Sequence, residues 1–193
     1  MMDMEATAAR MAEFNARADL KTLSPIRREM EMMKAAWGSR PMIEFMLQHG
    51  RDYRIGPDTF AGPRGEPKRC YMNASQLAFE AELYGRDLTY VEGKVLTCGI
   101  TIDHAWCIDA DGTVIDPTLE EDRTDFAAVV GYYGVPFKTP YLRKATLANG
   151  HYGLLDIMSA PKTLPQLIEL GLEAGQQWLL DQKKPLRRKR KAG

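Results

Sequence analysis

The chain has 193 residues, enough for one domain with a sizeable hydrophobic core. Its 26 basic and 26 acidic residues balance, yet seven basic residues lie within positions 183–193, so residues 1–182 hold 19 basic against 26 acidic residues, a net charge of −7. This acidic balance excludes a general electrostatic attraction between the main part of the chain and nucleic acid.

We therefore divide the chain into one domain, residues 1–182, and a flexible basic tail, residues 183–193. A solvated end is the simplest interpretation of the tail, and contact with nucleic acid or an acidic partner is the alternative. The three cysteines are an odd number without a Cys-x-x-Cys pair, and no segment has the roughly 20 apolar residues that span a bilayer. We expect a soluble cytoplasmic protein without membrane contact.

Residues 1–50 are predicted to be mainly helical. Residues 3–20 are rich in strong helix formers. A second helix should begin after Ser24, an N-cap residue followed by proline, and end near Trp37. A third, short helix over residues 41–49 completes this part of the domain.

The next segment leads to the first candidate site residue. Residues 51–67 hold three prolines and three glycines, which predicts a loop without regular structure. Residues 70–84 then predict a helix, because apolar residues recur at helical spacing and Gly85 follows as a terminator. The predicted buried stripe consists of Cys70, Ala74, Leu77, Ala78 and Ala81. Cys70 therefore opens the helix on its buried face.

Strands dominate the following part. Aromatic and β-branched residues predict strands over residues 88–98, 100–108 and 113–118, and residues 132–137 predict an edge strand. The stretch before Thr163 is too mixed to assign, and a last helix should begin at Thr163. This order favours an α+β fold, with an antiparallel sheet packed on the helix that carries the cysteine and further helices at both ends.

The turn between the second and third predicted strands decides which side chains share a face. A three-residue turn that ends at Gly112 makes His104 face Thr118 and places Asp116 diagonally beside His104, about 7–8 Å away along the backbone. Trp106 shares that face and either shelters the imidazole or fills the core. A two-residue turn would put Asp116 on the opposite face, because side chains alternate along a strand.

Cys70, His104 and Asp116 have the chemistry of a nucleophilic relay. A thiol attacks a carbonyl carbon as thiolate, a histidine supplies the base, and a carboxylate fixes the tautomer of that histidine. A helix start and a neighbouring imidazolium both favour the thiolate, and the backbone N–H of Cys70 could bind an oxyanion. Each residue alone is more often structural, but their order and spacing together favour a site.

The other candidates carry weaker signals. Cys98 and Cys107 lack an activating neighbour, so we interpret them as packing residues. His151 is an alternative base in a loop, and Gln48 is a candidate second oxyanion donor only through its amide and its place upstream of Cys70. Three scattered histidines and the lack of a glycine-rich phosphate motif predict neither a metal site nor a cofactor.

Four segments carry a family resemblance. They are Cys70-Tyr71-Met72-Asn73-Ala74, Tyr90-Val91-Glu92-Gly93, His104-Ala105-Trp106 and Asp111-Gly112-Thr113-Val114-Ile115-Asp116-Pro117-Thr118. Together they resemble the core of the transglutaminase-like branch of the papain-like cysteine enzyme superfamily, over residues 66–137. Residues 132–137, with the sequence Tyr-Tyr-Gly-Val-Pro-Phe, resemble a motif of small bacterial and phage-type proteins. The resemblance implies Cys70 as nucleophile, His104 as base and then acid, and Asp116 as the group that orients His104.

The implied function is a chemistry without a defined substrate. The resemblance implies a thiol hydrolase or acyltransferase that acts on a protein, peptide or other amide, as a protease, a deamidase or a transglutaminase-like enzyme. The alternative is a catalytically inactive binding or adaptor protein of the same fold, which would hold a partner through its cleft, its N-terminal helices or its basic tail.

Overall fold

The computed structural model describes residues 4–38, 40–55, 65–119 and 129–155, together with the helical residues Pro161, Leu164, Pro165 and Leu167. The basic tail and nearly all of the helix expected from Thr163 lie outside the described residues. Among the described residues, no helix combines the length and the apolar character needed to cross a bilayer.

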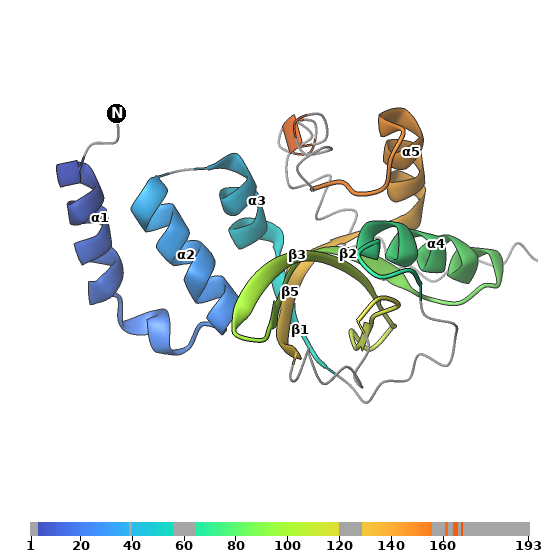
Figure 1. Ribbon diagram of the computed structural model, residues 1–193, viewed down its shortest axis with the longest axis horizontal. Coiled ribbons are helices and arrows are strands. Elements are labelled where there is room, and N and C mark those ends of the chain that lie inside the picture. The colour runs from blue at the N-terminus through green and yellow to red at the C-terminus, as the bar shows by residue number, and fades with distance from the viewer. Residues whose placement is uncertain are drawn as a thin grey trace, which may run out of the picture.

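A five-stranded antiparallel sheet lies at the centre of the fold (Figure 1). In spatial order its strands are β1 (Arg51–Tyr53), β5 (Val129–Phe137), β2 (Thr89–Thr97), β3 (Ile100–Ile108) and β4 (Val114–Ile115). The sheet curls until its edges meet: Arg54, directly after β1, forms a bridge with Thr113, and its carbonyl oxygen accepts a 3.0 Å hydrogen bond from the Val114 N–H. The curl encloses one face of the sheet and leaves the other face to the helices.

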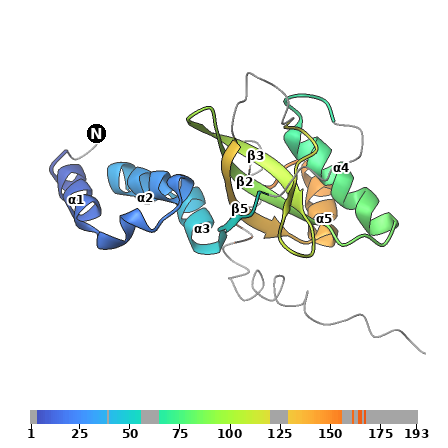
Figure 2. The same cartoon turned by 90° about the horizontal axis from the view of Figure 1, so that it is seen from below.

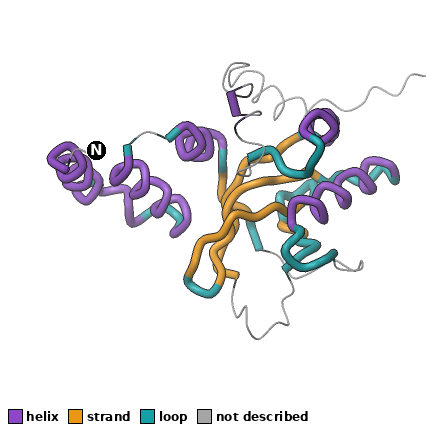
Figure 3. The backbone as a smooth tube through the Cα atoms, turned by 45° about the horizontal axis from the view of Figure 1, so that its top comes forward, coloured by secondary structure: helices purple, strands orange, loops and turns teal. Residues whose placement is uncertain are grey.

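The helices lie in two groups around this sheet. They are α1 (Met4–Ala16), the 3₁₀ helix η1 (Ala18–Lys21), α2 (Pro25–Trp37), α3 (Pro41–His49), α4 (Cys70–Leu83) and α5 (Thr139–Asn149). Figure 2 shows α1, α2 and α3 in a row that leads away from the sheet, with α4 and α5 on the other side. The Ser24 hydroxyl caps α2 by accepting a hydrogen bond from the Arg27 N–H, as predicted. The α+β class is confirmed, and Figure 3 shows the strands gathered at the centre with helices on either side.

α4 packs on the outer face of the sheet through small side chains. Ala74 and Ala78 are fully buried in a core cluster that also contains Ala105 and Cys107 of β3. The Cys107 thiol donates a hydrogen bond of 3.3 Å to the carbonyl oxygen of Ala74. This close approach fixes the helix along β3, so its first residue, Cys70, has a defined position relative to the strand.

Aromatic side chains fill the enclosed face. Trp106 is fully buried and meets Tyr53 and Tyr132 edge to face, with ring centroids 5.7 Å and 5.0 Å apart. Gly134 makes room for this ring, because an added Cβ would lie 2.7 Å from Trp106 Cη2 and 2.5 Å from the carbonyl oxygen of Glu92. Packing therefore explains the glycine of the Tyr-Tyr-Gly-Val-Pro-Phe segment.

A buried carboxylate ties the segment after α5 to the sheet. The Glu92 side chain, only 1% exposed on β2, accepts hydrogen bonds from the Tyr90 hydroxyl at 2.7 Å and from the Leu155 N–H at 2.8 Å. The Leu154 N–H donates to the same carboxylate. A buried charge needs such donors, so Glu92 has a structural role among the described residues.

Several sequence predictions were wrong about strand order and extent. β5 is an inner strand between β1 and β2, not an edge strand, although Pro136 lies beyond the residues that pair with β1. Residues 51–53 form β1 where a loop was expected, because β5 offers them a pairing partner. β4 is shorter than the predicted strand over residues 113–118, since the chain turns at Asp116.

Candidate active site

The hairpin of β3 and β4 has the predicted three-residue turn. Cys107 pairs with Ile115, and the Asp109 N–H donates a 3.1 Å hydrogen bond to the carbonyl oxygen of Thr113. Gly112 has a φ of 77°, the left-handed conformation that this turn requires. The pairing of β3 with β4 ends at Ile115, so on the side of β3 away from β2 no described strand lies beside His104, and the chain beyond β4 can bend toward the ring.

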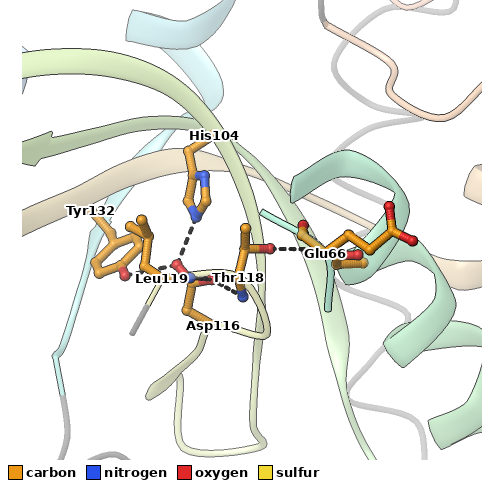
Figure 4. Close-up of polar contacts among 7 residues, drawn as sticks. Glu66, His104, Asp116, Thr118, Leu119 and Tyr132 are labelled. Atoms are coloured by element: carbon orange, nitrogen blue, oxygen red, sulfur yellow. Dashed lines mark hydrogen bonds and ion pairs between the residues drawn. The ribbon is translucent and has the colours of Figure 1, made fainter. Parts of the chain in front are cut away.

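His104 and Asp116 are joined by a short, buried hydrogen bond. His104 Nε2 lies 2.6 Å from Asp116 Oδ2, and the two side chains are only 3% and 7% exposed. Figure 4 shows the carboxylate below the ring. The expected contact between the imidazole and the carboxylate is therefore present.

The Asp116 carboxylate is held on both oxygens. Oδ1 accepts hydrogen bonds from the backbone N–H groups of Thr118 at 2.8 Å and Leu119 at 3.0 Å. Oδ2 accepts one from the Tyr132 hydroxyl at 2.9 Å, in addition to the His104 contact. Burial acts to raise the pKa of Asp116, but the His104 charge and the hydrogen-bond donors outweigh it, so the pKa lies below its ordinary value. Asp116 is thus a fixed anion.

His104 is correspondingly a strong base. Burial acts to lower its pKa, but the charge and hydrogen bond of Asp116 and the hydrogen bond and charge of Cys70 raise it to about 9. Because Nε2 faces Asp116, Nδ1 is the ring nitrogen with which the Cys70 sulfur would interact in a relay. His104 thus has both partners that a relay needs, a carboxylate and a thiol.

Cys70 occupies the first position of α4 and is partly exposed. No side chain caps α4, and the first N–H groups of a helix have no acceptor within the helix. Two residues earlier, Lys68 has a φ of 65°, a left-handed conformation that is unfavourable for a side chain other than glycine. This turn directs the chain into α4, whose first residue, Cys70, is partly exposed.

Asn73 joins the cysteine helix to the aspartate loop. Its Nδ2 donates hydrogen bonds to the Glu66 carbonyl oxygen at 2.8 Å and to Thr118 Oγ1 at 3.0 Å (Figure 4). The Gly65 N–H also donates to the Pro117 carbonyl oxygen at 2.8 Å. These contacts connect α4 and the segment that leads into it to the residues that directly follow Asp116.

Trp106 lies beside the imidazole. Its ring is nearly parallel to that of His104, with an angle of 15° between the planes and 6.2 Å between the centroids. Both open interpretations of Trp106 hold, since it fills the enclosed core and covers the His104 ring on one side. Exclusion of water on that side strengthens the His104 to Asp116 interaction.

The weaker candidates lie outside this cluster. Cys107 is buried, and burial raises the pKa of its thiol far above the ordinary value, in agreement with a packing role. Cys98 is exposed in the tight turn between β2 and β3, so the packing interpretation was wrong for it. His151 Nδ1 lies 3.3 Å from the carbonyl oxygen of Asn149 in the turn after α5. Gln48 is exposed on α3.

Two parts of the site were not identified from the sequence. Tyr132 was predicted only as a strand residue, and Asn73 was named only within the family-like segment that begins at Cys70. The roles of Tyr132 and Asn73 depend on the pairing of β5 with β2 and on the turn at Asp116. Both features are set by the tertiary fold. Among the described residues, no cluster of histidine, cysteine or carboxylate side chains could hold a metal ion.

Comparison with known proteins gives no relative: no family model, curated protein or solved structure matches this chain.

Proposed function

We propose that this chain is a cysteine-dependent amide hydrolase or acyltransferase of the transglutaminase-like class. The observation that carries the proposal is the arrangement around His104, which hydrogen-bonds the anion Asp116 through Nε2 and interacts with the Cys70 thiol. The three groups come from α4, from β3 and from the segment that follows β4.

The first half-reaction forms a thioester. The Cys70 thiol gives its proton to His104, and the thiolate attacks the carbonyl carbon of the amide to form a tetrahedral oxyanion. N–H groups at the start of α4, including that of Cys70, can stabilise the oxyanion. The imidazolium then gives its proton to the leaving amine, the C–N bond breaks, and the acyl group remains on the sulfur.

The second half-reaction releases the acyl group. Neutral His104 takes a proton from water or from an amine, the oxygen or nitrogen attacks the thioester carbon, and the C–S bond breaks. The proton on His104 returns to the sulfur, so the resting site is restored. Asp116 stays ionised throughout and stabilises the imidazolium in each half-reaction.

The setting of the reaction is part of the proposal. None of the three cysteines, all of which lie in the described part of the chain, forms a disulfide, which agrees with work in a reducing compartment such as the cytoplasm. The substrate is a protein, peptide or other amide.

An activated ester tests the proposal without knowledge of the natural substrate. The protein is mixed with p-nitrophenyl acetate, and nitrophenol release is followed together with the mass of the labelled peptides. We expect a rapid first turnover that leaves one acetyl group on Cys70. In His104→Ala the rate of this acetylation should fall by about 10²-fold or more. Cys70→Ala controls for labelling elsewhere. Acetylation of Cys98 as fast as that of Cys70 would contradict the proposal.

A further inference from the structure

Asp116 Oδ2 serves two donors at once. His104 Nε2 lies 2.6 Å and the Tyr132 hydroxyl 2.9 Å from the same oxygen. Figure 4 shows the tyrosine ring on one side of the carboxylate and the imidazole above it. The two donors therefore share the negative charge of one atom.

Tyr132 is held in place by its surroundings. It is only 4% exposed, its ring meets Trp106 edge to face, and its centroid lies 6.3 Å from that of His104. It belongs to β5, whereas His104 belongs to β3 and Asp116 follows β4. A third strand thus reaches the pair, and a phenol packed in this way has little freedom to leave the carboxylate.

The hydrogen bond has consequences for both partners. It fixes the plane of the carboxylate, and it stabilises the negative charge that also attracts the imidazolium. A donor that withdraws charge from Oδ2 reduces the stabilisation of protonated His104. Besides Asp116, the titratable groups among the described residues that face His104 are the Cys70 thiol on α4 and the Tyr132 phenol on β5, whereas the Cys107 thiol on β3 donates to Ala74 on the outer face of the sheet.

We infer that Tyr132 is a positioning residue, which orients Asp116 and sets how strongly that carboxylate holds the proton on His104. The importance of Tyr132 for catalysis rests on the proposed function. Its effect on the protonation of His104 concerns only the side chains of Tyr132, Asp116 and His104. Tyr132 acts through Asp116 and does not touch the reacting sulfur in this scheme.

The test follows the imidazole of His104 directly. The full chain is labelled with ¹⁵N-histidine, the His104 signal is assigned by its loss in His104→Gln, and its titration is recorded in Tyr132→Phe. We expect the midpoint to rise by about half a pH unit or more, because Oδ2 then offers its charge to the imidazolium alone. An unchanged or lower midpoint would overturn the inference.

Tyr53→Phe is the matched control. Tyr53 is a buried tyrosine that meets the same Trp106 ring, so its substitution also removes a phenol oxygen from the core but leaves Asp116 untouched. The His104 midpoint should remain as in the unsubstituted protein. An equal rise in both variants would assign the effect to general loosening of the core.

A second measurement does not depend on the folding of Tyr132→Phe. Site-specific 3-fluorotyrosine at position 132 keeps the ring but makes the hydroxyl a stronger donor, so the His104 midpoint should fall; a midpoint that stays or rises would contradict the inference. Failure here is distinct from failure of the proposed function. A shifted His104 midpoint with an unreactive Cys70 would reject the proposed enzyme and keep the role of Tyr132. An unchanged midpoint with a reactive Cys70 would keep the proposed enzyme and reject the role of Tyr132.

Discussion

Asn73 on α4 donates a 3.0 Å hydrogen bond to the hydroxyl of Thr118, two residues after Asp116. It joins the helix that carries Cys70, the proposed nucleophile, to the loop that carries the Asp116 carboxylate, across 45 residues of sequence. Because Asn73 is only 5% exposed, neither partner can exchange this bond for water at low cost. The distance between Cys70 and the His104 to Asp116 pair therefore depends on a contact outside the proposed relay.

Substitution of Asn73 tests this connection. Asn73→Ala should lower the free energy of unfolding by about 1–3 kcal/mol, because it removes the donor of two hydrogen bonds at a buried position. It should also slow alkylation of Cys70, since α4 is then free to move relative to the loop. Urea unfolding and mass spectrometry of alkylated peptides measure the two effects. Normal stability and normal Cys70 reactivity together would contradict the role of Asn73.

Gly65 provides a coupled test of the same contact. An added Cβ at Gly65 would lie 2.2 Å from Asn73 Cγ, so Gly65→Ala should be destabilising while Asn73 is present. In the double variant with Asn73→Ala the obstacle is gone, and the combined loss should be smaller than the sum of the single losses. Simple additivity of the two losses would show that the residues do not interact as described.

Two glycines of β5 should respond differently to alanine. Gly134→Ala should lower the free energy of unfolding by about 1–3 kcal/mol or more, because the added Cβ would meet both the Trp106 ring and the backbone of Glu92. Gly131→Ala is the control on the same strand: its Cβ has ordinary contact, 3.9 Å from Ile26 Cδ1, and should be tolerated. Thermal unfolding compares the variants. Similar losses at both positions would reject the tight packing of Trp106 against Gly134.

The buried pair makes stability depend on pH in a defined direction. The pKa of His104 is raised from 6.5 to about 9 in the folded chain, since Asp116 and Cys70 outweigh burial. The folded state therefore binds this proton more tightly than the unfolded state. Its contribution, on the order of 3 kcal/mol, is fully present below pH 6.5 and is lost as the pH rises through about 9. Asp116 has a lowered pKa, so its contribution is lost instead as the solution is acidified.

Urea unfolding at about pH 6 and about pH 10 checks this dependence. The unsubstituted protein should lose stability between the two values, and Asp116→Asn should lose less, because the group that raises the pKa of His104 has become neutral. Asp103→Asn is the control, since Asp103 is an exposed carboxylate that pairs with Lys94. Equal losses in the unsubstituted protein and in Asp116→Asn would contradict the assignment.

Local patterns in the sequence predicted the parts of the site that local structure determines. The three-residue turn that ends at Gly112 sets the register of the hairpin, and with it the diagonal placement of His104 and Asp116. The helical stripe after Cys70 is confirmed at Ala74, Leu77, Ala78 and Ala81, with Cys70 itself only partly buried. Both features depend on spacing within a few residues, which the sequence displays directly.

Features that depend on distant pairing were not predictable in the same way. The pattern along residues 132–137 indicates a strand but not its neighbours, so the inner position of β5 and the donor role of Tyr132 were missed. The closure of the sheet through Arg54 and Thr113 likewise joins residues 59 positions apart. The sequence thus predicted the contact between His104 and Asp116, but not the strand order and the sheet closure around it.

The most direct test of the central claim compares two thiols in one protein. Cys98 is exposed in the turn between β2 and β3, whereas Cys70 is only partly exposed and interacts with His104. At about pH 6, iodoacetamide should alkylate Cys70 at least about 10-fold faster than Cys98, because only the thiolate reacts and the imidazolium favours it. His104→Ala should remove the advantage. Equal alkylation of the two cysteines, or an advantage of Cys70 that persists in His104→Ala, would contradict a catalytic pair at this site.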